Sequence, residues 1–128
     1  MTLARYISIQ MDGLSPRTLV EGETIRHKAT LRDGLRNTGE LVDPETVQVL
    51  VRPPSRPIDE DPLLYNYGGI EPVVDKVGTG IYSLDLTLDE PGEWIFRWEM
   101  GDDWTGVIEY SLSVRTSRVL TREPEDTP

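Results

Sequence analysis

Few residues in this chain could carry out acid–base or metal chemistry. His27 is the only histidine among the 128 residues, and there is no cysteine. A general base or a zinc site needs further groups close by, such as a nucleophile or more nitrogen and sulfur ligands. No such motif surrounds His27, which falls on the apolar face of an alternating segment. We therefore expect this histidine to be packed in the core or at an interface.

Acidic residues are the next groups that could bind or react. They gather at residues 59–61, 89–93 and 102–103. A calcium ion requires roughly six to eight oxygen atoms that converge on it, and none of these clusters has the spacing of an EF-hand loop. Carboxylates in loops are usually solvated. We expect solvated loops here, with calcium held between loops as the alternative.

Motifs for nucleophilic, phosphoryl-transfer or zinc chemistry are absent, because the chain has no GxSxG, P-loop, HExxH or CxxC. We expect no catalytic residue, no metal, no cofactor and therefore no enzyme. Aromatic side chains could stack a sugar, but Trp94 and Trp98 share one strand face with Phe96. Such a stripe is typical of a core. Trp104 lies in or beside a turn, outside this stripe.

The charge balance excludes one class of partner. The chain has 23 acidic and 13 basic residues, which gives a net charge of -10. That field repels phosphate backbones, so we expect no nucleic-acid partner. No stretch approaches the ~20 apolar residues of a membrane helix, and the first residues lack the pattern of a signal peptide. We expect no membrane partner.

Alternation of apolar and polar residues organises the chain and predicts strands with almost no helix. Pro53, Pro54 and Pro57 each remove a ladder donor, so the segment that contains them is expected to be a loop. A short strand is expected to begin at Val73. The last three expected strands, joined by tight polar turns, predict a meander. Four earlier strands are expected at residues 3–11, 25–32, 47–52 and 63–67, and the last three at residues 82–88, 94–100 and 108–114.

The faces of these strands give two sets of residues. The structural core is expected to contain Tyr82, Leu84, Leu86, Trp94, Phe96 and Trp98. The first strand spans ~35 Å, which is longer than a typical strand. We expect it to contact another subunit or to add a strand at a sheet edge. The segment from Arg52 to Gly69 is the second candidate. The candidate interface residues of the first strand are Leu3, Arg5, Ile7, Ile9 and Met11.

Three positions around the strongest strands have expected structural roles. Gly80 can take a backbone conformation that is unfavourable for other residues, just before a strand. The hydroxyl of Tyr82 is expected to tie its strand to a neighbouring loop, like a tyrosine corner. Pro91 and Gly92 are expected to form a hairpin turn.

The segment from Gly78 to Glu99 reads GTGIYSLDLTLDEPGEWIFRWE. A T-G-x-Y motif, a strand, a D-x-P-G-x-W turn and an aromatic-R-W-E run follow one another in it. This order resembles small immunoglobulin-like proteins encoded among the virion genes of tailed bacteriophages and prophages. The segment LVDPETV at residues 41–47 also resembles that family, and the likeness covers about Glu23 to Val114. The family has no catalytic residues to transfer.

Strand spacing and this resemblance together predict an all-β fold: an immunoglobulin-like antiparallel β-sandwich of about seven or eight strands. We expect an N-terminal arm or edge strand at residues 1–17, the sandwich at 18–116 and a polar C-terminal tail at 117–128. The resemblance implies a structural virion component, either a capsid decoration protein or a head–neck or tail accessory protein. It would be made in the host cytoplasm, bind other virion proteins, and form a homo-oligomer within the particle. The alternative is a cell-surface or secreted adhesion module that recognises sugar or protein.

Overall fold

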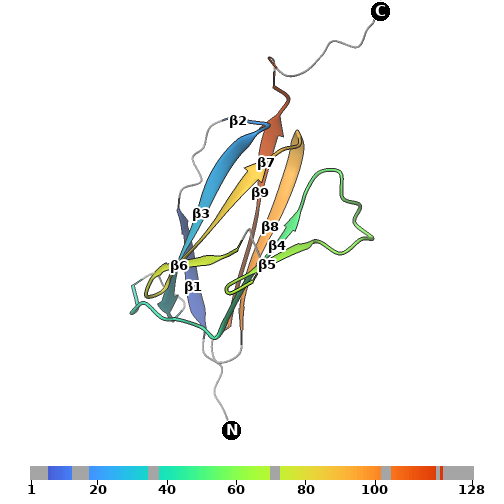
Figure 1. The fold of residues 1–128 in the computed structure, drawn as a ribbon. Coiled ribbons are helices and arrows are strands. Elements are labelled where there is room, and N and C mark those ends of the chain that lie inside the picture. Colours follow the sequence, from blue (N-terminus) through green and yellow to red (C-terminus); the bar gives the residue numbers. More distant parts are fainter. Residues whose placement is uncertain are drawn as a thin grey trace, which may run out of the picture.

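The computed structural model of the chain describes residues 6–12, 18–34, 38–69, 73–101, 105–117 and 119. Over these ranges the chain forms strands and no helix, and the strands make two sheets stacked face to face (Figure 1). The strands are β1 (Ile7–Asp12), β2 (Leu19–Val20), β3 (Glu23–Asp33), β4 (Thr46–Arg52), β5 (Leu63–Asn66), β6 (Asp75–Gly78), β7 (Ile81–Leu88), β8 (Gly92–Gly101) and β9 (Gly106–Arg115).

The two sheets contain their strands in the orders β1-β3-β7-β6 and β2-β9-β8-β4-β5. Neighbouring strands are antiparallel except β2, which pairs in parallel with the end of β9. The expected all-β sandwich is confirmed. The described residues contain nine strands where seven or eight were expected. The short strand expected from Val73 corresponds to β6, which begins at Asp75. The strand that was not expected is β2, whose two residues are too few to show an alternation.

The expected meander of the last three strands is wrong. Of these three strands, β8 and β9 form a hairpin with each other, whereas β7 pairs with β3 and β6 in the other sheet. The turn at Pro91 and Gly92 therefore carries the chain from one sheet to the other. The physical reason is that β7 and β8 each have a fully apolar face. Two such faces are buried most completely when they oppose each other across the core of a sandwich.

The core lies between these two faces. The expected core residues of β7 and β8 are all buried, with exposed fractions between 0% and 8%. In β3 the alternation holds as expected, since every second side chain from Ile25 to Leu31 is buried and the residues between them face outward. His27 is one of the buried residues and is fully enclosed. The buried residues from the two strands β7 and β8 are Tyr82, Leu84, Leu86, Trp94, Phe96 and Trp98.

A small polar cluster fixes the start of β7 to the segment that precedes β4. The Tyr82 hydroxyl donates a hydrogen bond to Asp43 Oδ1 at 3.2 Å, and the Gly80 N–H donates to the same oxygen at 2.7 Å. Lys76 Nζ lies 2.9 Å from Asp43 Oδ2. Burial alone would raise the pKa of Asp43, but the bonds from Gly80 and Lys76 outweigh it and lower that pKa. The tyrosine tie expected from the sequence is present.

Gly80 is expected to be intolerant of any side chain. Its φ is +70°, and an added Cβ would lie 2.9 Å from the Leu31 carbonyl oxygen and 2.9 Å from Leu41 Cβ. Gly80→Ala should therefore lower the free energy of unfolding by more than the ~1–2 kcal/mol of a left-handed residue. Gly34→Ala is the matched control, because Gly34 has φ +94° with nothing within 4 Å of its Cβ position. Urea denaturation of both variants measures the difference. Equal losses would mean that the contacts around Gly80 have no energetic weight.

Candidate functional site

The first strand, which the sequence singled out as an interface, is an edge strand of the sandwich. β1 pairs with β3 along its whole length. Ile7 is buried, and Ile9 and Met11 are half-buried against the core. Leu3 and Arg5 lie outside the described residues.

Of the two expectations for this strand, an added strand at a sheet edge is present, and contact with another subunit stays a prediction. The domain covers this face itself, because the described strand has only six residues and the start of β9 lies close to it. Gly106 makes the close approach possible, since a Cβ there would lie 3.2 Å from Ile7 Cβ.

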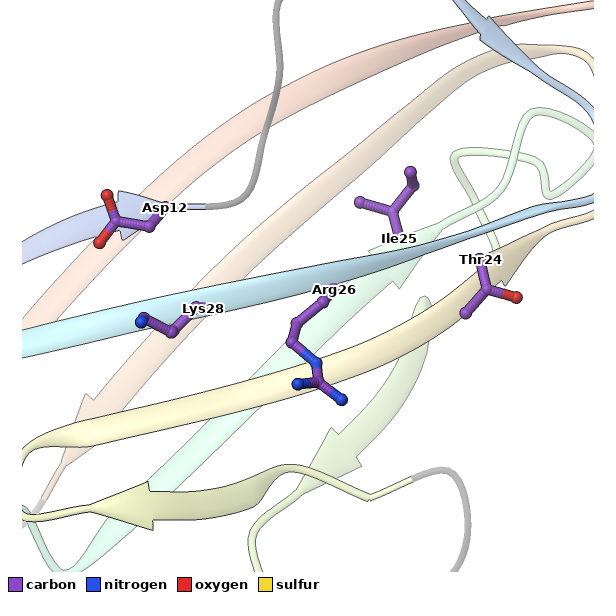
Figure 2. A pocket seen from close by; sticks show the side chains of 5 residues that line it. All are labelled: Asp12, Thr24, Ile25, Arg26 and Lys28. Atoms are coloured by element: carbon purple, nitrogen blue, oxygen red, sulfur yellow. The ribbon is translucent and has the colours of Figure 1, made fainter.

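A hollow of about 410 Å³ lies where β1 ends at Asp12 and β3 continues beyond it (Figure 2). Its charged side chains are Asp12, Arg26 and Lys28. Arg26 binds Asp85 of the neighbouring strand with two hydrogen bonds of 2.8 and 2.9 Å. Figure 2 shows Ile25 projecting to the opposite side of β3 from Arg26. The two cations and the two carboxylates offset each other, so this hollow has no strong preference for a charged ligand.

The connection between β4 and β5 is braced by hydrogen bonds between its own residues. Arg52 Nη1 donates to the carbonyl oxygens of Pro57 and Glu60, the latter at 2.8 Å. Arg56 Nε donates to the Asp61 carbonyl oxygen. Figure 1 shows this connection standing out from the body of the sandwich. A projecting loop that is held in one shape loses less conformational entropy when it binds a partner.

This loop is also fixed to the rest of the domain. The Glu90 carboxylate accepts hydrogen bonds from the Ser55 backbone N–H at 3.0 Å and from the Ser55 hydroxyl at 2.9 Å. Further along the loop, Ile58 is 84% exposed. Three acidic residues follow it at positions 59–61. The loop therefore presents one large apolar side chain beside negative charge.

Ile58 lies beside an apolar area on the outer face of the five-stranded sheet. A hollow of about 230 Å³ lies there. Its apolar lining comes from Ile58 and Pro62 of the loop, Leu50 of β4 and Ile95 of β8, and its charged lining from Arg52, Arg97 and Glu109. Leu64 of β5 is the cross-strand neighbour of Leu50 and is 53% exposed. We call these five apolar residues the outer-face patch. Apolar side chains that cluster on an outer face mark interaction sites more often than isolated ones do.

The patch has a charged rim. Arg97 Nε lies 2.6 Å from Glu99 Oε2, and Arg97 Nη1 lies 3.3 Å from Glu109 Oε1. Hydrogen bonds from Arg97 and then from Gln48 lower the pKa of Glu99. These exposed pairs add little stability. They do give the patch the apolar centre and polar border that protein interfaces show.

Comparison with known proteins bears on the fold. No family model and no curated protein matches the chain. Among solved structures, it is similar to one described as "Crystal structure of the Lin-41 filamin domain", with a TM-score of 0.56 and 18% sequence identity. The match covers 84% of this chain and 91% of that one. The fold is immunoglobulin-like. At this identity the likeness concerns the fold alone.

Two other kinds of feature, a metal centre and a membrane-spanning helix, have no candidate among the described residues. Within them, no three histidine, aspartate or glutamate side chains gather as metal ligands would. In the same part of the chain, no helix is long and apolar enough to cross a membrane. Trp104 lies outside the described residues.

The outer-face patch was only partly visible in the sequence. The segment from Arg52 to Gly69 was the second interface candidate, and the braced loop lies in it. The outward residues Leu50 and Ile95 were not predicted from the sequence to belong to an interface. The available signal was that each interrupts an alternation, because an apolar residue stands where the pattern calls for a polar one. A strand that is apolar on both faces indicates that its outer face is also covered.

Proposed function

We propose that the chain is a structural component of a tailed-bacteriophage virion that acts by binding other virion proteins and performs no catalysis. In this proposal it is an immunoglobulin-like capsid decoration protein or a head–neck or tail accessory protein. The sequence resemblance between Gly78 and Glu99 supports the virion assignment, and the immunoglobulin-like fold is compatible with it. The observation that carries the binding role is the outer-face patch with its braced loop.

The proposed partner is a virion subunit with a basic rim around an apolar pocket. The acidic residues 59–61 beside Ile58 favour basic groups on the partner. The net charge of -10 opposes contact between two copies through this acidic loop. Copies within one particle would therefore be spaced by the subunits that hold them.

Purified particles of the phage that encodes the chain test the virion assignment. The protein should remain with the particles through density-gradient purification, in a fixed ratio to the major capsid protein. A high copy number would indicate decoration of the capsid, and a low one a place at the neck or tail. Absence of the protein from particles in which all other structural proteins are present would contradict the assignment.

Ile58→Asp is expected to weaken attachment to particles by about tenfold or more, since buried apolar anchors dominate interface energies. Stability should change little, because Ile58 is 84% exposed in the free protein. Val77→Asp is the matched control, with the same charge change at a valine that is 61% exposed on the other sheet. The measurement is binding of each purified variant to particles that lack the protein. Equal binding by both variants would exclude the loop as the anchor.

A further inference from the structure

On the side of the sandwich between β5 and β7, the chain covers the core over only part of the length of β7. At the closed part, Tyr67 and Val74 form a parallel bridge, and the Val74 N–H lies 3.5 Å from the Asn66 carbonyl oxygen. Val74 is 1% exposed there, and the Tyr67 ring meets the Tyr82 ring edge-on at 5.7 Å. The chain therefore covers its own core at this level.

The rest of that side is open because β6 pairs with only the first part of β7. The ladder between β6 and β7 begins at the pair Asp75–Ser83, although β7 continues to Leu88. In an antiparallel strand, successive peptide groups point to alternate sides. The Leu31 N–H bonds to the Gly80 carbonyl oxygen, which fixes the even-numbered residues of β7 toward β3.

This alternation leaves an unpaired edge on β7. The N–H and C=O groups of Asp85 and Thr87 point to the same side as those of Ser83, and no described strand pairs with them there. The unpaired stretch from Leu84 to Leu88 spans about 17 Å at the usual rise of a strand. Such an edge is a template for one further short strand.

A groove of about 340 Å³ lies beside this edge, between β7 and β5. Its floor is apolar, with Leu86 and Trp94 from the core and Leu63 and Tyr65 from the inner face of β5. The indole N–H of Trp94 is satisfied by the Glu90 carbonyl oxygen at 3.0 Å, so the ring offers only apolar surface to the groove.

Carboxylates line the outer margin of the groove at Asp85, Asp89 and Glu90. Asp85 is already held by Arg26, and Glu90 by Ser55. Asp89 forms no ion pair with any described residue, and it faces Tyr65 closely enough to contribute, after burial, to raising the pKa of that phenol. The margin therefore attracts positive charge.

We propose that this groove accepts an extended segment of a partner protein as an added strand on β7, with apolar and basic residues in alternation. Its peptide groups pair with those of Asp85 and Thr87. The side chain level with Leu86 enters the apolar groove, while its neighbours along the segment point outward toward the acidic margin. The net charge of -10 disfavours a second copy of this chain as the occupant. This site is separate from the outer-face patch, so the two proposals can fail independently.

A capped heptapeptide of alternating lysine and valine is the probe, with alternating glutamate and valine as its charge control. Titration of the isotope-labelled full chain, followed through its backbone amides, should give saturable binding with a Kd below ~1 mM. The amides of Asp85 and Thr87 should exchange at least about tenfold more slowly in the complex. Those of Leu84 and Leu86 already bond to β3 and should change little. The glutamate peptide should bind more weakly than the lysine peptide, because the acidic margin repels it.

Two variants separate edge pairing from general attraction between opposite charges. Thr87→Pro removes the outward N–H without removing a bond to β3, and the probe should bind it at least about tenfold more weakly. Thr87→Val is its control, because both variants lose the 2.8 Å contact between the Thr24 and Thr87 hydroxyls while valine keeps the N–H. If the proline variant does not fold, slowed exchange of the Asp85 and Thr87 amides in the parent chain is the test of edge pairing.

The proposal is overturned by any of four results. The first is equal binding to the proline and valine variants. The second is the absence of saturable binding up to about 1 mM peptide. The third is protection that maps to residues other than Asp85 and Thr87. The fourth is a dimer of the free protein that dissociates in Thr87→Pro, because the occupant would then be a second copy.

Discussion

Trp98→Ala is expected to lower the free energy of unfolding by about 3–5 kcal/mol. Trp98 is fully buried in the middle of β8, between the two sheets, and its side chain is among the largest in the core. Its indole N–H donates to the Tyr110 hydroxyl at 2.9 Å. The alanine variant would leave a cavity and would also remove this donor. A loss of that size is a large share of the stability of a small domain.

Urea denaturation of the parent and the variant measures this loss. Val77→Ala serves as the control, because Val77 is 61% exposed and its substitution should change the free energy of unfolding by less than about 0.5 kcal/mol. A Trp98→Ala variant as stable as the control would mean that β8 does not pack across the core in the register described here.

Acid is expected to destabilise the domain through His27 before the carboxylates contribute. Burial lowers the pKa of His27 to about 4, an effect that the nearby Asp85 only partly offsets. The His27 Nδ1 lies 2.9 Å from the Tyr110 hydroxyl oxygen. Since Trp98 already donates to that oxygen, the hydroxyl hydrogen is free to donate to Nδ1, which keeps the ring neutral. The other ring nitrogen, Nε2, is buried without a partner among the described residues.

The sign of the effect follows from the two pKa values. The unfolded chain takes up a proton near pH 6.5 and the folded chain only near pH 4. Between these values the unfolded state binds more protons, so stability falls as the pH falls. The contribution of His27 is fully present above pH 6.5 and is lost by about pH 4, a change of about 3 kcal/mol. Asp43, Asp85 and Glu99 have lowered pKa values and lose their contributions at more acidic pH.

His27→Phe isolates this contribution, because phenylalanine has a similar ring and does not titrate. The variant loses the bond to Tyr110 and is expected to be less stable than the parent at neutral pH. The measurement is the slope of the free energy of unfolding between about pH 6.5 and pH 4.5, in parent and variant. The parent should lose stability over this range and the variant should lose little. Parallel curves would contradict a buried neutral histidine.

The sequence predicted the parts of the fold that depend on local pattern. The inward faces of β3, β7 and β8 could be identified because alternation shows directly which side chains are buried. The role of Tyr82 could be inferred because a glycine precedes its strand and the tyrosine falls on the inward face of the alternation. The sheet assignment of β7 could not be inferred, because alternation does not say whether two apolar faces lie side by side or face to face.

The candidate sites depend on relations that no local pattern contains. The outer-face patch forms because the loop after β4 positions Ile58 next to Leu50 and Ile95. The open edge of β7 exists because β6 is shorter than its neighbour. The contact of Ile7 with the start of β9 could not be inferred, because it is made by residues far apart in the chain.

In the proposed function, this immunoglobulin-like domain binds a virion subunit through its outer-face patch. Hydrogen–deuterium exchange of the protein, free and bound to purified particles, tests it most directly. We predict that binding slows exchange in the loop at residues 53–62 and in the adjoining parts of β4 and β8, while the outward residues of β3 exchange as in the free protein. Unchanged exchange in the loop, with protection confined to other strands, would contradict the proposal.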